Sequence, residues 1–139
     1  MRDRNGIFDI VTKPNINIAV VDDEEPIRRA LLRLMRSVGI QAHAFASCAE
    51  FLKSLEAAQP DCVILDLHMP QATGFDVQTR LQRDWPHIAV IVVTGHHSTE
   101  AQARAMLCAP VAYLHKPMND QALLDSIALA MQRRAAAGQ

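Results

Sequence analysis

Five short apolar runs, each followed by a longer segment with helical spacing, constrain the fold of this chain more than any other feature of its sequence. The runs cover residues 16–21, 40–45, 62–65, 88–93 and 111–114, and the second is the weakest because Gln41 and His43 interrupt it. Apolar side chains recur three and four positions apart in the segments that follow, which cover residues 26–38, 47–58, 74–84, 98–108 and 119–134. This alternation is typical of a parallel β-sheet with helices on both faces. We therefore expect an α/β fold, a doubly wound five-stranded parallel sheet.

Right-handed crossovers between the strands favour the order 2-1-3-4-5 of flavodoxin-like (βα)5 folds. Local signals support the element boundaries, because Gly39 is a typical helix end and Ser47 with Glu50 has the spacing of a capping box. Met35 and Met106 stand at helical spacing, and we expect both in the core. In such sheets, ligands bind outside the carboxyl ends of the strands, near the point where the strand order reverses.

The length and charge of the chain bound its organisation and its partners. We expect a loose N-terminal leader over residues 1–15, one domain over residues 16–135 and a frayed tail over residues 136–139. With 14 basic and 15 acidic residues the formal net charge is −1, which does not favour nucleic-acid or membrane binding. The longest apolar run has six residues, against roughly 20 for a membrane span. Three widely spaced cysteines indicate no disulfide framework, so we expect a cytoplasmic protein.

Acidic residues stand at the carboxyl ends of two strands that should be neighbours. Asp22 and Asp23 follow the first strand, and Asp66 ends the third. Three carboxylates in one small volume raise one another's pKa unless a cation intervenes, and Mg²⁺ prefers such oxygen ligands. We interpret the next two acids, Glu24 and Glu25, as solvated caps of the following helix.

Two further side chains complete a phosphoryl-binding pattern at the same edge. Thr94 ends the fourth strand and Lys116 follows the fifth. A lysine, a hydroxyl and a metal ion together can hold the oxygens of a phosphoryl group, and Asp66 would then be the nucleophile that forms an aspartyl phosphate. No glycine-rich phosphate loop follows the first strand, where a run of acids would repel a nucleotide.

Four segments that contain these residues resemble the receiver domain of two-component response regulators. The segments are VVDDEEPIR (20–28), ILDLHMPQATGFD (64–76), VVTGH (92–96) and YLHKP (113–117). The resemblance covers residues 16–134, and VTGHH (93–97) looks most like regulators of the nitrogen-fixation and LuxR type. Each segment alone is a weak signal, but their order at successive strand ends makes the combination specific.

The resemblance implies a role for each metal-site residue. Asp66 matches the aspartate that is phosphorylated. Asp23 and Asp66 match direct Mg²⁺ ligands, and Asp22 matches the acid that acts through water. The backbone carbonyl of His68 matches a further ligand.

The resemblance also implies a switch. Thr94 and Lys116 match the residues that contact the phosphoryl group, and Tyr113 matches the aromatic residue that turns inward when Thr94 moves. The peptide bond between Lys116 and Pro117 is expected to be cis.

A receiver of this kind implies a signalling switch and not a classical enzyme, since it catalyses only its own phosphoryl transfer and autodephosphorylation. Its donor would be a histidine kinase or a phosphotransfer protein. The face built by the fourth helix, the fifth strand and the fifth helix would carry the signal, and a homodimer could form through it. These elements are expected over residues 98–108, 111–114 and 119–134.

One segment departs from the family pattern. Family members usually carry glycine after the fourth helix, whereas this chain has Cys108, Ala109 and Pro110. Because alanine tolerates a left-handed conformation poorly, we expect this loop to adopt another geometry. The remaining histidines, which include His97 and His115, are interpreted as surface or loop residues.

Two alternatives to the switch remain open. One is a Mg²⁺-dependent phosphohydrolase with an aspartate nucleophile, as in the haloacid dehalogenase group, although that chemistry needs an aspartate two residues after the nucleophile and this chain has His68. The other is a receiver-like interaction module that works without phosphate.

Overall fold

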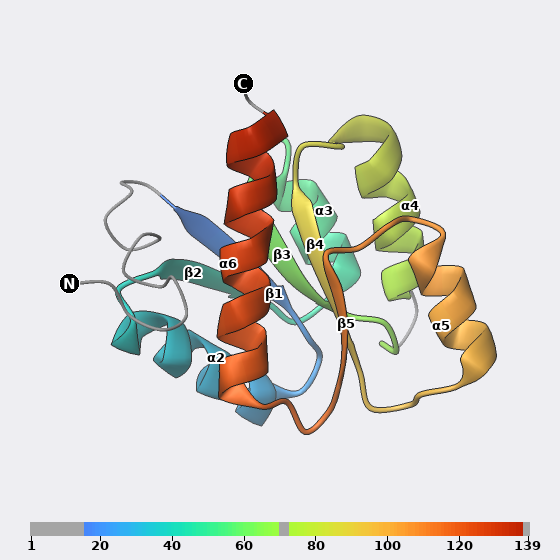
Figure 1. Ribbon diagram of the computed structural model, residues 1–139, viewed down its shortest axis with the longest axis horizontal. Coiled ribbons are helices and arrows are strands. Elements are labelled where there is room, and N and C mark those ends of the chain that lie inside the picture. The colour runs from blue at the N-terminus through green and yellow to red at the C-terminus, as the bar shows by residue number, and fades with distance from the viewer. Residues whose placement is uncertain (1–15, 70–72, 138–139) are drawn as a thin grey trace.

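Five strands form one parallel sheet in the computed structural model, which describes residues 16–69 and 73–137 (Figure 1). The sheet order is β2-β1-β3-β4-β5, which confirms the expected strand order. All of the paired strands run parallel. The strands are β1 (Asn17–Val21), β2 (Gln41–Phe45), β3 (Cys62–Asp66), β4 (Ala89–Thr94) and β5 (Ala112–His115).

The described helices lie on both faces of this sheet. They are α2 (Glu25–Ser37), α3 (Cys48–Ser54), α4 (Gly74–Asp84), α5 (Thr99–Met106) and α6 (Asp120–Ala137). Helices α2 and α6 cover one face, and α3, α4 and α5 lie on the other side (Figure 1). No helix among the described residues is long and apolar enough to cross a membrane.

Two helices end several residues from the expected positions, since α3 ends at Ser54 instead of Ala58 and α6 extends further than predicted. Helix α6 continues to Ala137, past the expected end at Arg134 and into the first residues of the expected tail. The expected leader, residues 1–15, and residues 138–139 lie outside the described residues.

The central strands bury both of their faces, which explains their continuous apolar sequence. In β1, Ile18 and Val20 join the core layer under α2 and α6, whereas Ala19 and Val21 join the layer under α3 and α4. Burying one large apolar side chain contributes about 1.5–3 kcal/mol, so these two layers supply the main driving force for folding. They also fix the sheet edge from which the acidic residues project.

Local signals set several helix ends as expected. The Ser47 hydroxyl accepts a hydrogen bond from the Glu50 amide at 3.1 Å, and Gly39 follows α2 with a φ of 77°. Met35 is fully buried, as predicted. The prediction for Met106 is wrong, because it ends α5 at the surface with 48% of its area exposed.

The loop after α5 contradicts the expectation that Ala109 would avoid the left-handed conformation, because its φ is 48°. The Ala109 amide donates to the Met106 carbonyl at 3.0 Å, which closes the last turn of α5. Two residues later the Val111 amide donates to the Val90 carbonyl at 2.8 Å, which starts the pairing of β5 with β4. These two hydrogen bonds hold alanine where glycine is easier to accommodate.

Replacing Ala109 with glycine should therefore stabilise the protein. Removing the steric strain of alanine in the left-handed conformation should stabilise the folded state by about 1–2 kcal/mol. The greater flexibility of glycine in the unfolded chain offsets about 0.4–1 kcal/mol of this gain. We expect a net gain of about 0.5–1 kcal/mol for Ala109→Gly in urea unfolding at equilibrium. Ala103→Gly, at an exposed position within α5, is the control and should lose about 1 kcal/mol. A loss of stability in Ala109→Gly would contradict the strain argument.

Candidate functional site

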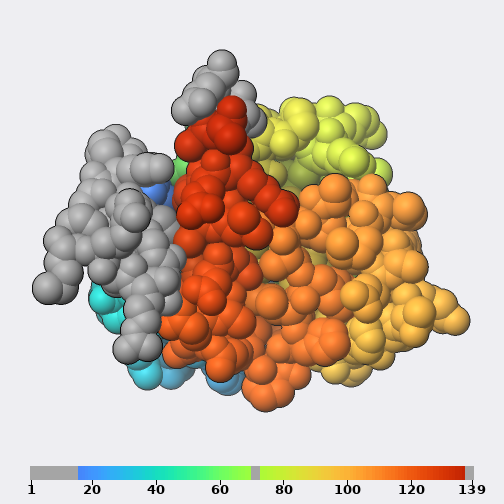
Figure 2. Space-filling view, in the orientation of Figure 1, coloured from blue at the N-terminus to red at the C-terminus, as the bar shows by residue number. Residues whose placement is uncertain are grey.

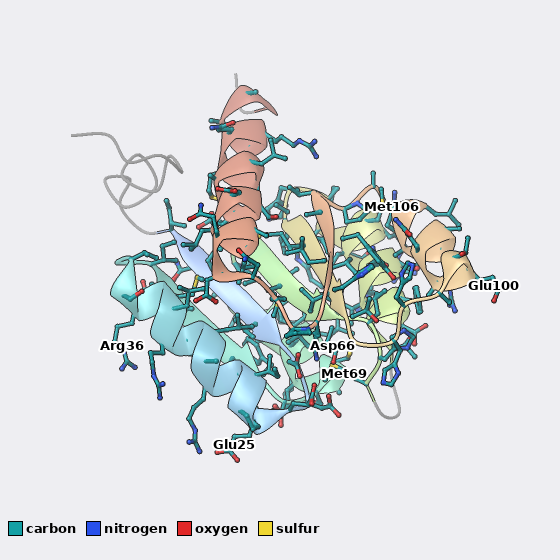
Figure 3. All side chains as sticks on the ribbon, turned by 60° about the horizontal axis from the view of Figure 1, so that its bottom comes forward. Glu25, Arg36, Asp66, Met69, Glu100 and Met106 are labelled. Carbon is teal, nitrogen blue, oxygen red and sulfur yellow. The ribbon has the colours of Figure 1, made fainter. Side chains whose placement is uncertain are left out.

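Four carboxylates meet at the carboxyl ends of β1 and β3. Asp22, Asp23, Glu24 and Asp66 each offer an oxygen, and these oxygens all lie within 4.8 Å of one another. The register of the two strands pairs Val21 with Leu65, so the residues after them emerge side by side. Figure 3 shows Asp66 at the carboxyl end of the sheet. The first turn of α2, where Glu25 lies, is at the same end. The predicted convergence of acids is therefore confirmed.

Asp22 is held rigidly at the base of this cluster and is only 1% exposed. Its Oδ1 accepts a hydrogen bond from the Glu24 amide at 2.9 Å, and its backbone carbonyl accepts one from Arg28 Nη1 at 2.8 Å. These contacts fix the turn from β1 into α2. They also leave Asp22 Oδ2 directed toward a cation.

The cation in this structure is Lys116, which reaches into the acidic cluster from the end of β5. Its Nζ lies 2.7 Å from Asp22 Oδ2, 2.8 Å from Glu24 Oε2 and 3.2 Å from Asp66 Oδ2. Burial alone would lower the pKa of Lys116, but hydrogen bonds to Asp22 and Glu24 and the charge of Asp66 raise it above its usual range. The ammonium group therefore stays charged at any physiological pH.

Asp66 has the opposite electrostatic balance. It is 2% exposed, and this burial raises its pKa above the usual range of a carboxyl group. The His68 amide, which donates to Asp66 Oδ1 at 3.1 Å, and the charge of Lys116 lower that pKa in part, whereas Asp22 raises it further. The positive charge of Lys116 therefore does not fully offset the effect of burial on the pKa of Asp66.

Thr94 lies beside Asp66 on the neighbouring strand. Asp66 pairs with Val93 in the register of β3 with β4, and Thr94 is the next residue along β4. The hydroxyl of this buried side chain accepts a hydrogen bond from the His96 amide at 3.0 Å, and the Thr94 carbonyl accepts one from the Lys116 amide at 2.8 Å. The backbone thus ties threonine and lysine together, and the bond between Lys116 and Pro117 is cis, as predicted.

A solvent-accessible pocket lies over these groups. It is lined by acidic residues, by His68 and His96, and by Gly95 and Lys116. The two imidazole rings are 5.4 Å apart and nearly perpendicular. Gly95 has no side chain to fill the entrance, so a small anionic group can approach Asp66 from solvent.

The structure does not place Tyr113 in this pocket. Its hydroxyl lies 3.4 Å from His97 Nδ1 at the edge of the sheet, and its ring is half-buried. His68 contacts the site through its amide nitrogen, and its predicted role as a carbonyl ligand stays a prediction. The inward turn of Tyr113 on phosphorylation also stays a prediction.

Glu24 is the site residue that the sequence interpretation missed. It precedes α2 as expected of a cap, but its side chain makes no capping hydrogen bond and pairs with Lys116 instead. That hydrogen bond lowers the pKa of Glu24. A fourth acid in a predicted acidic cluster was the available signal, but only the tertiary position of Lys116 distinguishes it from a cap.

Comparison with known proteins gives the family. A model of the response regulator receiver domain matches residues 18–128, which include all four carboxylates, Thr94 and Lys116. This chain belongs to the response regulator receiver family. Phosphorylation-activated switching is the general function of that family, whose members interact with histidine kinases.

Curated relatives of this receiver domain include nodulation protein W of Bradyrhizobium diazoefficiens, which is 40% identical over 84% of this chain. The transcriptional regulatory protein FixJ of Azorhizobium caulinodans is 29% identical over 90% of it. These relatives agree with the expected nitrogen-fixation subgroup. The chain spans 51% of the first and 59% of the second, so it matches about half the length of its curated relatives.

Solved receiver structures have the same fold. A response regulator receiver protein from Burkholderia phymatum is 39% identical, with a TM-score of 0.74 over 84% of this chain and 94% of that one. A CheY-like receiver domain from Methanospirillum hungatei, at 23% identity, has a TM-score of 0.83 over 87% of this chain and 97% of that one. The second likeness concerns the fold alone.

The receiver site depends on a close approach of α4 to the end of β3. The Gly74 amide donates to the Leu67 carbonyl at 3.0 Å. A Cβ atom at Gly74 would lie 2.5 Å from the Asp66 carbonyl oxygen and 2.7 Å from the Leu67 Cα, distances that real Cβ atoms do not adopt. Only glycine therefore fits between the helix and the strand that carries Asp66.

Gly74→Ala should displace the backbone at Asp66 and destabilise the domain by about 1–3 kcal/mol, as overpacking typically does. The matched control is Gly95→Ala, where the nearest atoms would be in the flexible side chain of Lys116 at 3.7 and 3.9 Å. We expect the control to change stability by less than about 0.5 kcal/mol in urea unfolding. Equal stabilities for the two variants would contradict the close approach.

The pKa of Asp66 predicts a pH-dependent effect of its removal in a metal-free buffer. A carboxyl whose pKa is raised by folding stabilises the folded state below its unfolded pKa, and this contribution is lost as the pH rises through the folded pKa. Asp66→Asn should therefore be more stable than the parent at pH 7.5 with EDTA. The difference should shrink as the pH falls toward about 4, the range in which an unfolded aspartate takes up its proton.

A suitable control for this comparison is Asp84→Asn. Hydrogen bonds from Arg83 and Arg80 lower the pKa of Asp84, so its replacement should be neutral or mildly destabilising at pH 7.5. Urea unfolding of both variants and the parent at several pH values measures the effect. A gain for Asp66→Asn that grows toward acid pH would refute the assigned direction.

Proposed function

We propose that this receiver domain accepts a phosphoryl group on Asp66 from the phosphohistidine of a histidine kinase or phosphotransfer protein. The observation that carries the proposal is the lysine ammonium within 3.2 Å of a buried carboxylate that opens onto a solvent-accessible pocket. Asp66 therefore opens toward a donor and lies beside a cation that can balance negative charge on a transferred phosphoryl group.

The transfer replaces one bond to phosphorus with another. An oxygen of Asp66 forms the new bond, while the bond between phosphorus and the donor imidazole breaks and its electron pair stays on the ring nitrogen. The Lys116 ammonium balances negative charge on the phosphoryl oxygens. The Thr94 hydroxyl, which only accepts a hydrogen bond in this structure, keeps its own proton to donate to one of them.

The charge count of the site favours a divalent cation. Four carboxylates and one ammonium leave three negative charges, and a divalent ion would reduce these to one. The donors are oxygens, as Mg²⁺ requires, and Asp22, Asp23 and Asp66 with the His68 carbonyl would hold it. When bound, Mg²⁺ supplies neutralisation of the phosphoryl oxygens during transfer.

The proposed output surface is the face formed by α5, β5 and α6. Three large apolar side chains are exposed on α5, just after it and on α6, namely Met106, Leu107 and Leu129. The two helices and the connection between them form one continuous surface (Figure 2). We propose that Thr94 moves toward the phosphoryl group and Tyr113 turns inward, which changes this face and promotes a homodimer or releases a partner.

Because the chain matches about half of its curated relatives, we propose that any DNA contact belongs to other parts of such regulators. We also propose that the protein works in the cytoplasm, where a two-component partner would phosphorylate it. A phosphohydrolase has less support, since the residue two positions after Asp66 is His68, whose Nε2 is buried without a hydrogen-bond partner.

Phosphorylation by a small donor tests the proposal directly. Acetyl phosphate with Mg²⁺ should add the mass of one phosphoryl group to the intact protein, and EDTA should prevent it. Asp66→Asn should stay unmodified, whereas Asp61→Asn, an aspartate at the opposite end of β3, should be modified like the parent. Lys116→Ala should lower the yield at least about tenfold, the order of a lost charge-stabilising contact.

Two outcomes would refute the assignment. One is an unmodified parent protein after prolonged exposure to a competent donor. The other is a modified Asp66→Asn variant. Steady turnover of small phosphate esters by the parent would instead favour the phosphohydrolase.

A further inference from the structure

The rings of His97, Tyr113 and His115 lie together at β5, the edge strand of the sheet, outside the acidic site. The centroids of His97 and His115 lie 4.3 Å apart with an angle of 35° between the ring planes. Tyr113 lies 5.9 Å from His97 and 5.6 Å from His115. The rings come from two separate segments of the chain, the β4–α5 loop and β5.

The sheet itself brings these residues together. Thr94 pairs with His115 in the register of β4 with β5, so the loop after Thr94 begins level with the end of β5. Tyr113 and His115 are two positions apart on β5 and project from the same face. His97 lies over both of them. Both histidines are exposed to solvent.

The contact with tyrosine prepares His97 as a ligand. Its Nδ1 lies 3.4 Å from the Tyr113 hydroxyl and can form a hydrogen bond with it. The other ring nitrogen, Nε2, is then available to bind a metal ion. Histidines that bind metals commonly have this arrangement, in which one ring nitrogen binds the metal and the other is oriented by a neighbouring group. His115, beside it, supplies a second imidazole.

We propose that His97 and His115 bind one divalent transition-metal ion of the Ni²⁺, Cu²⁺ or Zn²⁺ class, with water in the remaining coordination positions. Imidazole nitrogens suit these ions, whereas Mg²⁺ prefers the oxygen ligands of the acidic cluster. The two rings lie tilted against each other, so binding requires the exposed His115 ring to rotate until one of its nitrogens faces the same ion as His97 Nε2, while His97 keeps its contact with Tyr113. Exposed side chains make such rotations freely.

Calorimetric titration with Ni²⁺ tests this site on the unphosphorylated, untagged protein, with excess Mg²⁺ to saturate the acidic cluster. The parent should bind one equivalent. His97→Gln and His115→Gln should each abolish saturable binding. Tyr113→Phe, which keeps both ligands but removes the orienting hydroxyl, should weaken binding about 10–100-fold.

Matched controls are the exposed histidines at other places in the fold. His43 lies on β2, the opposite edge strand, and His87 precedes β4. The variants His43→Gln and His87→Gln should therefore bind Ni²⁺ like the parent. His96→Gln tests the neighbouring pair of His68 and His96 and should also bind normally. Broadening of the His97 and His115 ring signals by Ni²⁺ in NMR spectra gives an independent readout.

The proposal would be overturned if one equivalent of Ni²⁺ still bound to a variant that lacks both His97 and His115. Loss of binding in His96→Gln with retention in His97→Gln would overturn it too, since that would place the ion on the other pair. Because the titration uses unphosphorylated protein, its result does not depend on the role proposed for Asp66.

Discussion

The contacts of one ammonium group with three carboxylates connect the distant parts of this site. Lys116 Nζ reaches Asp22, Glu24 and Asp66, which come from the end of β1, the start of α2 and the end of β3. Without this cation the low solvent exposure of Asp22 and Asp66 would leave two charges buried and close together, a costly arrangement. The lysine therefore makes it possible to keep reactive carboxylates inside the edge of a folded sheet.

The single charge of the Lys116 ammonium also explains why phosphoryl transfer to Asp66 would need a further cation. One positive charge cannot balance four carboxylates, and burial already disfavours the ionised form of Asp66. A nucleophilic carboxylate must be ionised, so any ion that neutralises its surroundings also increases the reactive fraction. The stability of the fold and the reactivity of Asp66 thus depend on the same local charge balance.

Much of this arrangement could be predicted because parallel strands impose a simple rule. Side chains that follow successive strands must meet at one edge of the sheet, so Asp22, Asp66, Thr94 and Lys116 were placed correctly from their positions alone. The rule describes strand ends and says nothing of how a side chain turns afterwards. Glu24 was therefore mistaken for a simple helix cap.

The remaining errors have similar causes. Helical spacing placed Met106 in the core, but α5 ends there and its last turn reaches solvent. Residue preference argued against a left-handed Ala109, but two backbone hydrogen bonds outweigh that preference. The meeting of His97 with His115 depends on the path of a loop across a neighbouring strand, which local patterns do not encode.

Helix α6 links the two ends of the sheet. It begins shortly after Lys116 and Pro117, and near its other end Arg134 forms an ion pair with Asp61, which precedes β3 and also accepts a hydrogen bond from the Asn17 amide. At 1.5 Å per residue, its 18 residues form a rod about 27 Å long. Both ends of this helix are therefore tied to the sheet, one through the short connection after Lys116 and the other through the ion pair of Arg134 with Asp61. A single element thus joins the end of the sheet that carries the acidic cluster to the opposite end, where Asp61 precedes β3.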